Sequence, residues 1–158
     1  MPSAPFASAA PPARAPSLAF WLVSASGLVP FLVCLGLGYA RPDLREAAVQ
    51  TFLVYAALTL SFLGGARWGA ELVRAPDAPI VARLVLAAAP SVIGLLALLP
   101  QMPSRVALVL LAGSGIAQLL WDLAAGQRGL LPTWNGRVRT VLTVAGTACS
   151  AALWPLLT

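Results

Sequence analysis

Long apolar runs dominate the chain, and short polar segments separate them. There are five such runs, at about residues 18–40, 47–73, 80–99, 105–123 and 138–157. A helix of about 20 apolar residues crosses the roughly 30 Å hydrocarbon core of a bilayer. The pattern therefore predicts an all-α fold: a polytopic membrane protein with one domain over residues 17–158, a bundle of five transmembrane helices.

The first 16 residues precede these runs and contain five prolines but no acidic residue. Proline disfavours regular helix, so we expect residues 1–16 to form a disordered tail. An organellar targeting segment is the alternative, since such segments also lack acidic residues. The run that follows is too long for the apolar part of a signal peptide and is expected to stay in the protein. Pro30 lies in its middle and predicts a kink.

Composition supports a lipid environment and narrows the chemistry. Hydrophobic residues make up 59% of the chain and charged residues 9%, whereas a soluble domain carries about 25% charged residues. The absence of histidine and lysine excludes histidine-ligated metals and Schiff-base chemistry. No nucleophile–base pair, phosphate loop or metal-ligand spacing is present. We therefore expect a non-enzymatic protein without a metal, and membrane lipids as its surroundings.

Arginine supplies all of the positive charge, and its distribution predicts an orientation. The arginines are scattered between apolar runs, which argues against a nucleic-acid-binding surface. With five spans, one side of the membrane receives seven arginines and the other side three: Arg41, Arg45 and Arg105. Positive charge favours the cytoplasmic side. The N-terminus is therefore predicted to be cytoplasmic and the C-terminus periplasmic.

The segment from Ser61 to Glu71 interrupts the second run with glycines and charges. Small residues allow helices to approach closely in lipid, so Gly64, Gly65 and Gly69 are candidates for helix packing. Gly65 and Gly69 are four residues apart, and Gly113 with Ala117 and Gly146 with Ser150 have the same spacing. Packing within the bundle and dimerisation are the two interpretations. Cys34 and Cys149 are expected to be small buried hydrophobes rather than a disulfide pair.

Three charged residues form the main candidate site. Arg67 and Glu71 are one helical turn apart, and Asp122 ends the fourth run on the same side of the membrane. The second helix is long enough for Arg67 and Glu71 to reach the headgroup zone. A carboxylate offsets part of the cost of placing arginine in lipid. We predict an ion-paired cluster of Arg67 and Asp122 with Glu71 nearby, joining spans two and four.

Two alternatives to this ion-paired cluster stay open. Each charge could extend separately to water, or the cluster could form a functional polar site. Under direct pairing, exchanging the charges of Arg67 and Asp122 should restore what either single change loses. Trp68, Trp121 and Trp134 fall near the same interface, where an aromatic belt is the usual arrangement. A quinone or lipid-headgroup pocket lined by these rings and Arg67 is the alternative.

The sequence Ser-Phe-Leu-Gly-Gly-Ala-Arg-Trp-Gly at 61–69 resembles the hallmark of the transmembrane protein 69-like family, whose shared region is domain of unknown function 3429. A second block resembles the family around Trp121-Asp122-Leu123, Pro132-Thr-Trp134 and Arg137-Val138-Arg139. Many relatives are expected to carry tyrosine where this chain has Trp121. The resemblance implies a small polytopic protein of a bacterial inner membrane or, alternatively, of mitochondria, and it implies no catalytic residues.

Two functions remain as hypotheses. The small size, the helix-packing residues and the lack of a reaction site favour a non-enzymatic accessory or assembly subunit of a larger membrane complex. The alternative is a small transporter or a lipid- or quinone-binding protein with an inner-side polar pocket at Arg67. A cavity at Arg67 would favour the second hypothesis, and a solidly packed Arg67–Asp122 contact the first.

Overall fold

A computed structural model describes residues 17–73, 79–128 and 133–157, and every element in these ranges is helical. The predicted tail at 1–16 lies outside the described residues. The helices are α1 (Leu18–Ser26), α2 (Val29–Ala40), η1 (Pro42–Leu44), α3 (Arg45–Leu72), α4 (Ile80–Ala97), α5 (Ser104–Gln127), α6 (Thr133–Leu153) and η2 (Trp154–Leu156), where η denotes a short 3-10 helix.

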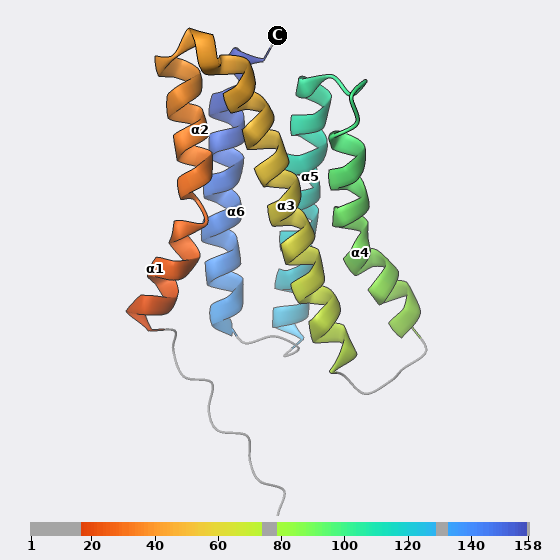
Figure 1. Cartoon of the computed structure of the whole chain (residues 1–158). Helices are drawn as coiled ribbons and strands as arrows, with labels where there is room; N and C mark the ends of the chain where they lie inside the picture. Colours follow the sequence, from red (N-terminus) through yellow and green to blue (C-terminus); the bar gives the residue numbers. More distant parts are fainter. Residues whose placement is uncertain (1–16, 74–78, 129–132, 158) are drawn as a thin grey trace, which may run out of the picture.

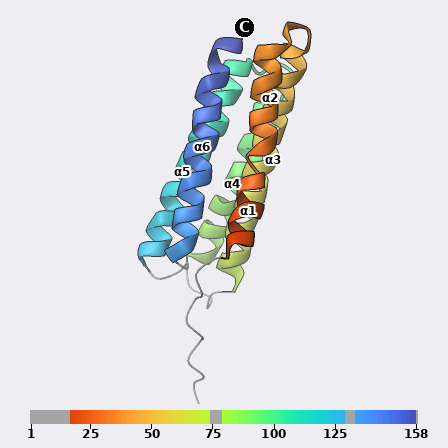
Figure 2. The ribbon, with the colours of Figure 1, turned by 90° about the vertical axis from the view of Figure 1, so that its left-hand side faces the viewer.

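The helices form an up-and-down bundle in which α1 and α2 act as one bent span (Figure 1). Helix α3 packs against α2, α4 and α5, and α6 packs against α2 and α5. The view turned by 90° shows α5 and α6 on one side and the α1–α2 span on the other (Figure 2). The start of α1 and the end of α6 lie at opposite ends of the bundle (Figure 1).

Within the described residues, four helical stretches are long and apolar enough to cross a membrane: Leu18–Ala40, Pro42–Leu72, Ile80–Ala97 and Ser104–Gln127. Helix α6 is less apolar, because its first turns carry Arg137 and Arg139. It nevertheless runs beside α2 along the bundle (Figure 1). The all-α, multi-span fold predicted from hydropathy is thus confirmed.

Two helix ends differ from the predicted spans. The predicted fourth span ends near 123 and the predicted fifth begins near 138, whereas α5 continues to Gln127 and α6 begins at Thr133. Hydropathy falls before the helices end, because polar residues such as Gln127, Asn135 and Arg137 belong to the terminal helical turns. The connection between the two helices is correspondingly shorter than the loop predicted at 124–136.

The predicted kink in the first span is a complete interruption of the helix. Helix α1 ends at Ser26, and α2 begins at Val29 with Pro30 in its first turn. Proline has no N–H to continue the helical ladder. The Tyr55 hydroxyl donates a 2.9 Å hydrogen bond to the carbonyl oxygen of Gly27 at this break. A side chain of α3 therefore satisfies a backbone group that the interrupted helix leaves open.

The core lies between α2, α3, α5 and α6. Phe31 packs edge-to-face on Phe52 and Tyr55, with both pairs of ring centroids 4.9 Å apart. Cys34 and Cys149 are buried in the same core and are not joined by a disulfide. They serve as small apolar side chains, as expected.

Candidate functional site

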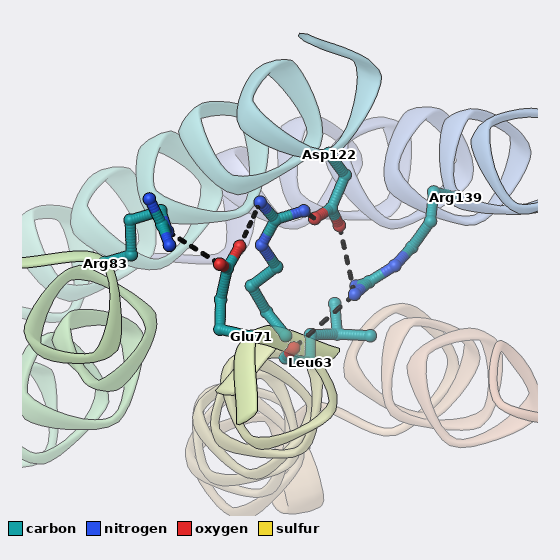
Figure 3. A network of polar contacts seen from close by, with 6 residues as sticks. Leu63, Glu71, Arg83, Asp122 and Arg139 are labelled. Carbon is teal, nitrogen blue, oxygen red and sulfur yellow. Dashed lines mark hydrogen bonds and ion pairs between the residues drawn. The ribbon is translucent and has the colours of Figure 1, made fainter. Parts of the chain in front are cut away.

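A linear chain of alternating charges crosses one end of the bundle (Figure 3). Helix α3 supplies Arg67 and Glu71, which lie in the middle of this chain of charges. Helix α4 supplies Arg83, α5 supplies Asp122 and α6 supplies Arg139. The order in space is Arg83, Glu71, Arg67, Asp122 and Arg139, so each carboxylate lies between two guanidinium groups.

The two ion pairs of Glu71 are the shortest contacts in the chain of charges. Arg67 Nη2 lies 2.7 Å from Glu71 Oε1, and Arg83 Nε lies 2.7 Å from Glu71 Oε2. Arg67 Nη1 donates to Asp122 Oδ1 at 3.4 Å. Arg139 Nη2 lies 3.0 Å from Asp122 Oδ2. Because Asp122 Oδ2 accepts no hydrogen bond from the described residues, this last contact is an ion pair without hydrogen-bond geometry.

The central charges are inside the bundle. Arg67 is 3% exposed, Glu71 1% and Asp122 2%. The position of Arg67 and Glu71 in the headgroup zone stays a prediction, and the structure encloses both side chains among the other helices. A buried charge is costly unless it is paired. The ion pairs therefore stabilise these charges in place of the water that each side chain would have contacted if it had extended separately to the surface.

The predicted cluster of Arg67, Glu71 and Asp122 is brought together, and two further arginines join it. From the sequence, Arg83 and Arg139 counted only as topology signals. Both lie within two turns of a helix start on the same side as Arg67, and this shared depth was the signal that could have placed them in the cluster. Arg74, which could also have reached Glu71, lies outside the described residues.

The three tryptophans do not line a common pocket. The Trp121 ring lies under the Arg67 guanidinium, 4.4 Å from centroid to Cζ. This is a cation–π contact that supports the buried arginine. Trp68 is on the outer surface at 43% exposure, where an interfacial aromatic belongs. Trp134 packs edge-to-face on Phe20 of α1, with centroids 5.1 Å apart.

The glycines of the central segment differ in their surroundings. A Cβ built on Gly64 would lie 2.6 Å from the carbonyl oxygen of Ala87, so α3 and α4 cross closely at this residue. Gly65 and Gly69 have nothing within 4 Å of such a Cβ. Of these three glycines, Gly64 therefore provides close packing inside the bundle, while Gly65 and Gly69 face outward.

Gln118 lies one turn before Asp122 on α5 and adds polarity next to the ion pairs. The side chain is 4% exposed, and neither its Oε1 nor its Nε2 bonds to a described residue. A buried amide without partners costs about 1–3 kcal/mol. Gln118 is therefore an unusual residue for a core position, which the sequence pattern did not predict.

A cavity of about 570 Å³ lies between the α1–α2 span, α3, α5 and α6. On α6 it is lined at positions 139, 142, 143, 146, 147 and 150, which follow one face of the helix. The lined stretch from Arg139 to Ser150 is about 16 Å long at 1.5 Å per residue. The cavity is thus elongated along the axis of α6.

The cavity is mostly apolar, and its charged end is formed by Arg139. Several of its hydroxyl groups bond within the protein: Thr59 and Ser150 donate to carbonyl oxygens one turn earlier in their own helices, and Tyr55 donates to Gly27. Arg139 lines the cavity and contacts Asp122, so it connects the cavity to the chain of charges. Arg67 does not line it. This cavity is therefore not the polar pocket expected at Arg67, and its arginine is Arg139.

No group of three or more histidine, cysteine, aspartate or glutamate side chains that could hold a metal occurs within residues 17–73, 79–128 and 133–157. The side chains at the site can form ion pairs and hydrogen bonds, and the cavity can accommodate apolar groups.

Comparison with known proteins finds relatives by sequence. The family model described as protein of unknown function (DUF3429) matches residues 15–155. The chain is also similar to transmembrane protein 69 of Xenopus tropicalis, with 36% identity over 139 residues that cover 82% of this chain and 51% of the relative. It thus spans about half the length of this relative. No solved structure matches.

Proposed function

Since this chain belongs to the DUF3429 family of membrane proteins, whose shared function is unknown, we propose from its geometry that it is a non-enzymatic binding protein for a lipophilic amphiphile. The ligand lies in the cavity between the helices, with its polar head at Arg139 and its apolar part toward Ser150. Quinones and lipids both belong to this chemical class.

The observation that supports this proposal is the cavity with one cationic end. Small-molecule pockets typically have volumes of about 300–1,000 Å³ and are mostly apolar with a few placed polar groups. The cavity falls in this range at about 570 Å³. Its elongated form and its single arginine suit a molecule with one polar end and one apolar end.

Filling the cavity tests the proposal. Gly146 lines the cavity, and an added Cβ there meets nothing within 4 Å. Gly146→Leu should therefore fold and reduce ligand binding at least tenfold. Gly113→Leu is the matched control, because Gly113 is also in a helix with open space around it but does not line the cavity.

Lipid extraction from the purified protein, followed by mass spectrometry, is the measurement. We expect a lipophilic molecule to co-purify with the wild-type protein and with Gly113→Leu but not with Gly146→Leu. Equal recovery from all three proteins would contradict binding in the cavity. A small transporter would use the same cavity, and a flux assay in vesicles separates it from a binding protein, since only a transporter moves the ligand across.

The second candidate is a non-enzymatic accessory or assembly subunit of a larger membrane complex. Two observations support it. The contact between Arg67 and Asp122 is buried, which is the outcome expected to favour an accessory subunit. Gly65 and Gly69 face outward on α3, where a partner helix could approach closely. Replacing both glycines by leucine should then release a partner that co-purifies in mild detergent. A wild-type protein that elutes alone would argue against this function.

For location, we propose a bacterial inner membrane with the N-terminus in the cytoplasm. The mitochondrial inner membrane is the alternative. The support is the excess of arginines at the end of the bundle that holds the start of α1. In this orientation the chain of charges lies at the cytoplasmic side.

A further inference from the structure

We infer that the head of the ligand is anionic: a carboxylate or phosphate that pairs with Arg139. This inference rests on the proposed binding function and narrows it from amphiphiles in general to those with a negatively charged head. It follows from the contacts of Arg139, which is the last member of the chain of charges and also lines the cavity.

Arg139 shares its carboxylate with a second arginine. Asp122 is the only acidic residue that contacts Arg139 in the described part of the chain, and its other oxygen pairs with Arg67. Arg139 therefore has a single carboxylate that it shares with Arg67, whereas Arg67 also pairs with Glu71. A largely buried guanidinium group that is only partly paired is costly, and an anion beside Arg139 would offset this cost.

Arg139 also has hydrogen-bond donors left to offer. Its contacts to Asp122 and to the carbonyl oxygen of Leu63, at 3.0 Å and 3.4 Å, both use Nη2. A guanidinium group has five N–H donors arranged as a fork, which suits the two oxygens of a carboxylate or phosphate. Nε and Nη1 bond to no other described residue, and 12% of the side chain remains exposed.

The direction of the Arg139 side chain places these donors at the cavity. Arg139 extends from α6 across to Leu63 on α3 (Figure 3), and both residues line the cavity. The guanidinium group thus lies at the end of the apolar space. A neutral head would leave Arg139 with only the carboxylate that it shares with Arg67, and a cationic head would be repelled.

Binding of two matched ligands tests this inference. Dodecanoate and dodecanol share the same chain and differ in head charge. We would measure saturable binding of each to the protein in phosphatidylcholine nanodiscs at about pH 8, well above the usual carboxyl pKa. The wild-type protein should bind dodecanoate at least tenfold more tightly than dodecanol.

The variants identify the group responsible. Arg139→Gln should reduce the preference for dodecanoate to less than twofold, whereas Arg139→Lys, which keeps the charge, should retain most of it. Gly146→Leu should weaken the binding of both ligands, and Gly113→Leu should change neither. Competition with phosphatidylglycerol then distinguishes the two possible origins of the anionic head. Displacement of dodecanoate indicates a phospholipid, and no displacement indicates a free single-chain acid.

Two results would overturn the inference in different ways. One result is that the wild-type protein binds dodecanoate and dodecanol equally and that Gly146→Leu weakens the binding of both. The cavity then binds amphiphiles, but the inference that their head is anionic is wrong. If neither ligand binds saturably and no lipophilic molecule co-purifies, the proposed binding function itself fails. The comparison of two ligands on the wild-type protein gives an answer even if Arg139→Gln does not fold.

Discussion

Arg67 is held by two carboxylates and by the face of one aromatic ring. Glu71 lies at 2.7 Å and Asp122 at 3.4 Å, while Trp121 covers one side of the guanidinium group. Each carboxylate also contacts a second arginine, so no ion pair in the chain is independent of the others. This connectivity changes what a mutation at Arg67 should do.

Exchanging the charges of Arg67 and Asp122 should fail to restore stability, contrary to the simple pairing expected from sequence. The exchange places a carboxylate one turn from Glu71 and a guanidinium group beside Arg139. Breaking a buried pair costs about 3–5 kcal/mol. We expect Arg67→Asp and Asp122→Arg each to lose about this much, and the double variant to recover none of it.

Unfolding in detergent, followed by circular dichroism, would measure this. The control is the exposed pair of Arg41 and Asp43, joined at 2.7 Å outside the bundle, where the same exchange should leave the unfolding midpoint unchanged. Recovery of the Arg67/Asp122 double variant to near wild-type stability would show that the two residues form an isolated pair.

Gln118 leads to a second prediction at the residue scale. Its buried amide has no partner among the described residues, so Gln118→Leu should raise the free energy of unfolding by about 1–3 kcal/mol. Chemical denaturation of the purified protein would measure the change. A loss of stability would instead show that the amide bonds to a molecule that is bound inside the protein.

At the scale of elements, the crossing of α3 and α4 depends on Gly64. The carbonyl oxygen of Ala87 leaves no room for a Cβ at this position, and Pro90 of α4 packs on the same spot. Neighbouring residues on a helix point about 100° apart. Gly65 therefore faces away from the crossing although it follows Gly64 directly.

Gly64→Ala should destabilise the protein by about 1–3 kcal/mol, the usual cost of overpacking. Gly65→Ala is the matched control, because it makes the same chemical change one residue away in open space, and it should cause no loss. Thermal unfolding of both variants under identical conditions is the comparison. Equal effects would mean that the close crossing does not limit stability.

At the scale of the whole molecule, the two ends of the bundle face opposite sides of a membrane. Ser17 precedes α1 at one end, and Gln101 lies in the connection between α4 and α5 at the other end. Both residues are exposed. The native Cys34 and Cys149 are buried, so an introduced cysteine should dominate labelling by a reagent that does not cross membranes.

Ser17→Cys should be labelled only in inside-out vesicles and Gln101→Cys only in intact cells, because the arginine excess predicts a cytoplasmic N-terminus. The unmodified protein, with its two buried cysteines, is the control for background labelling. The reverse pattern would overturn the proposed orientation, and labelling of both positions from the same side would overturn the topology.

The sequence alone predicted the class of fold and three members of the chain of charges, Arg67, Glu71 and Asp122. Apolar runs of membrane-crossing length are a local property of the chain, so hydropathy predicted the helices, and Pro30 predicted a kink in the first span where the structure has a complete break. Arg67 and Asp122 could be paired because counting spans places them at similar depth. The scarcity of charged residues made each one informative.

The tertiary structure decided what depends on the rotation and neighbours of each helix. It brought Arg83 and Arg139 into the chain of charges, chose Gly64 rather than Gly65 for close packing, and opened a cavity at Arg139 rather than at Arg67. Span counting fixes the depth of a side chain but not the direction in which it points. That direction follows from the packing of all the helices together, because only packing decides which faces meet and which remain open.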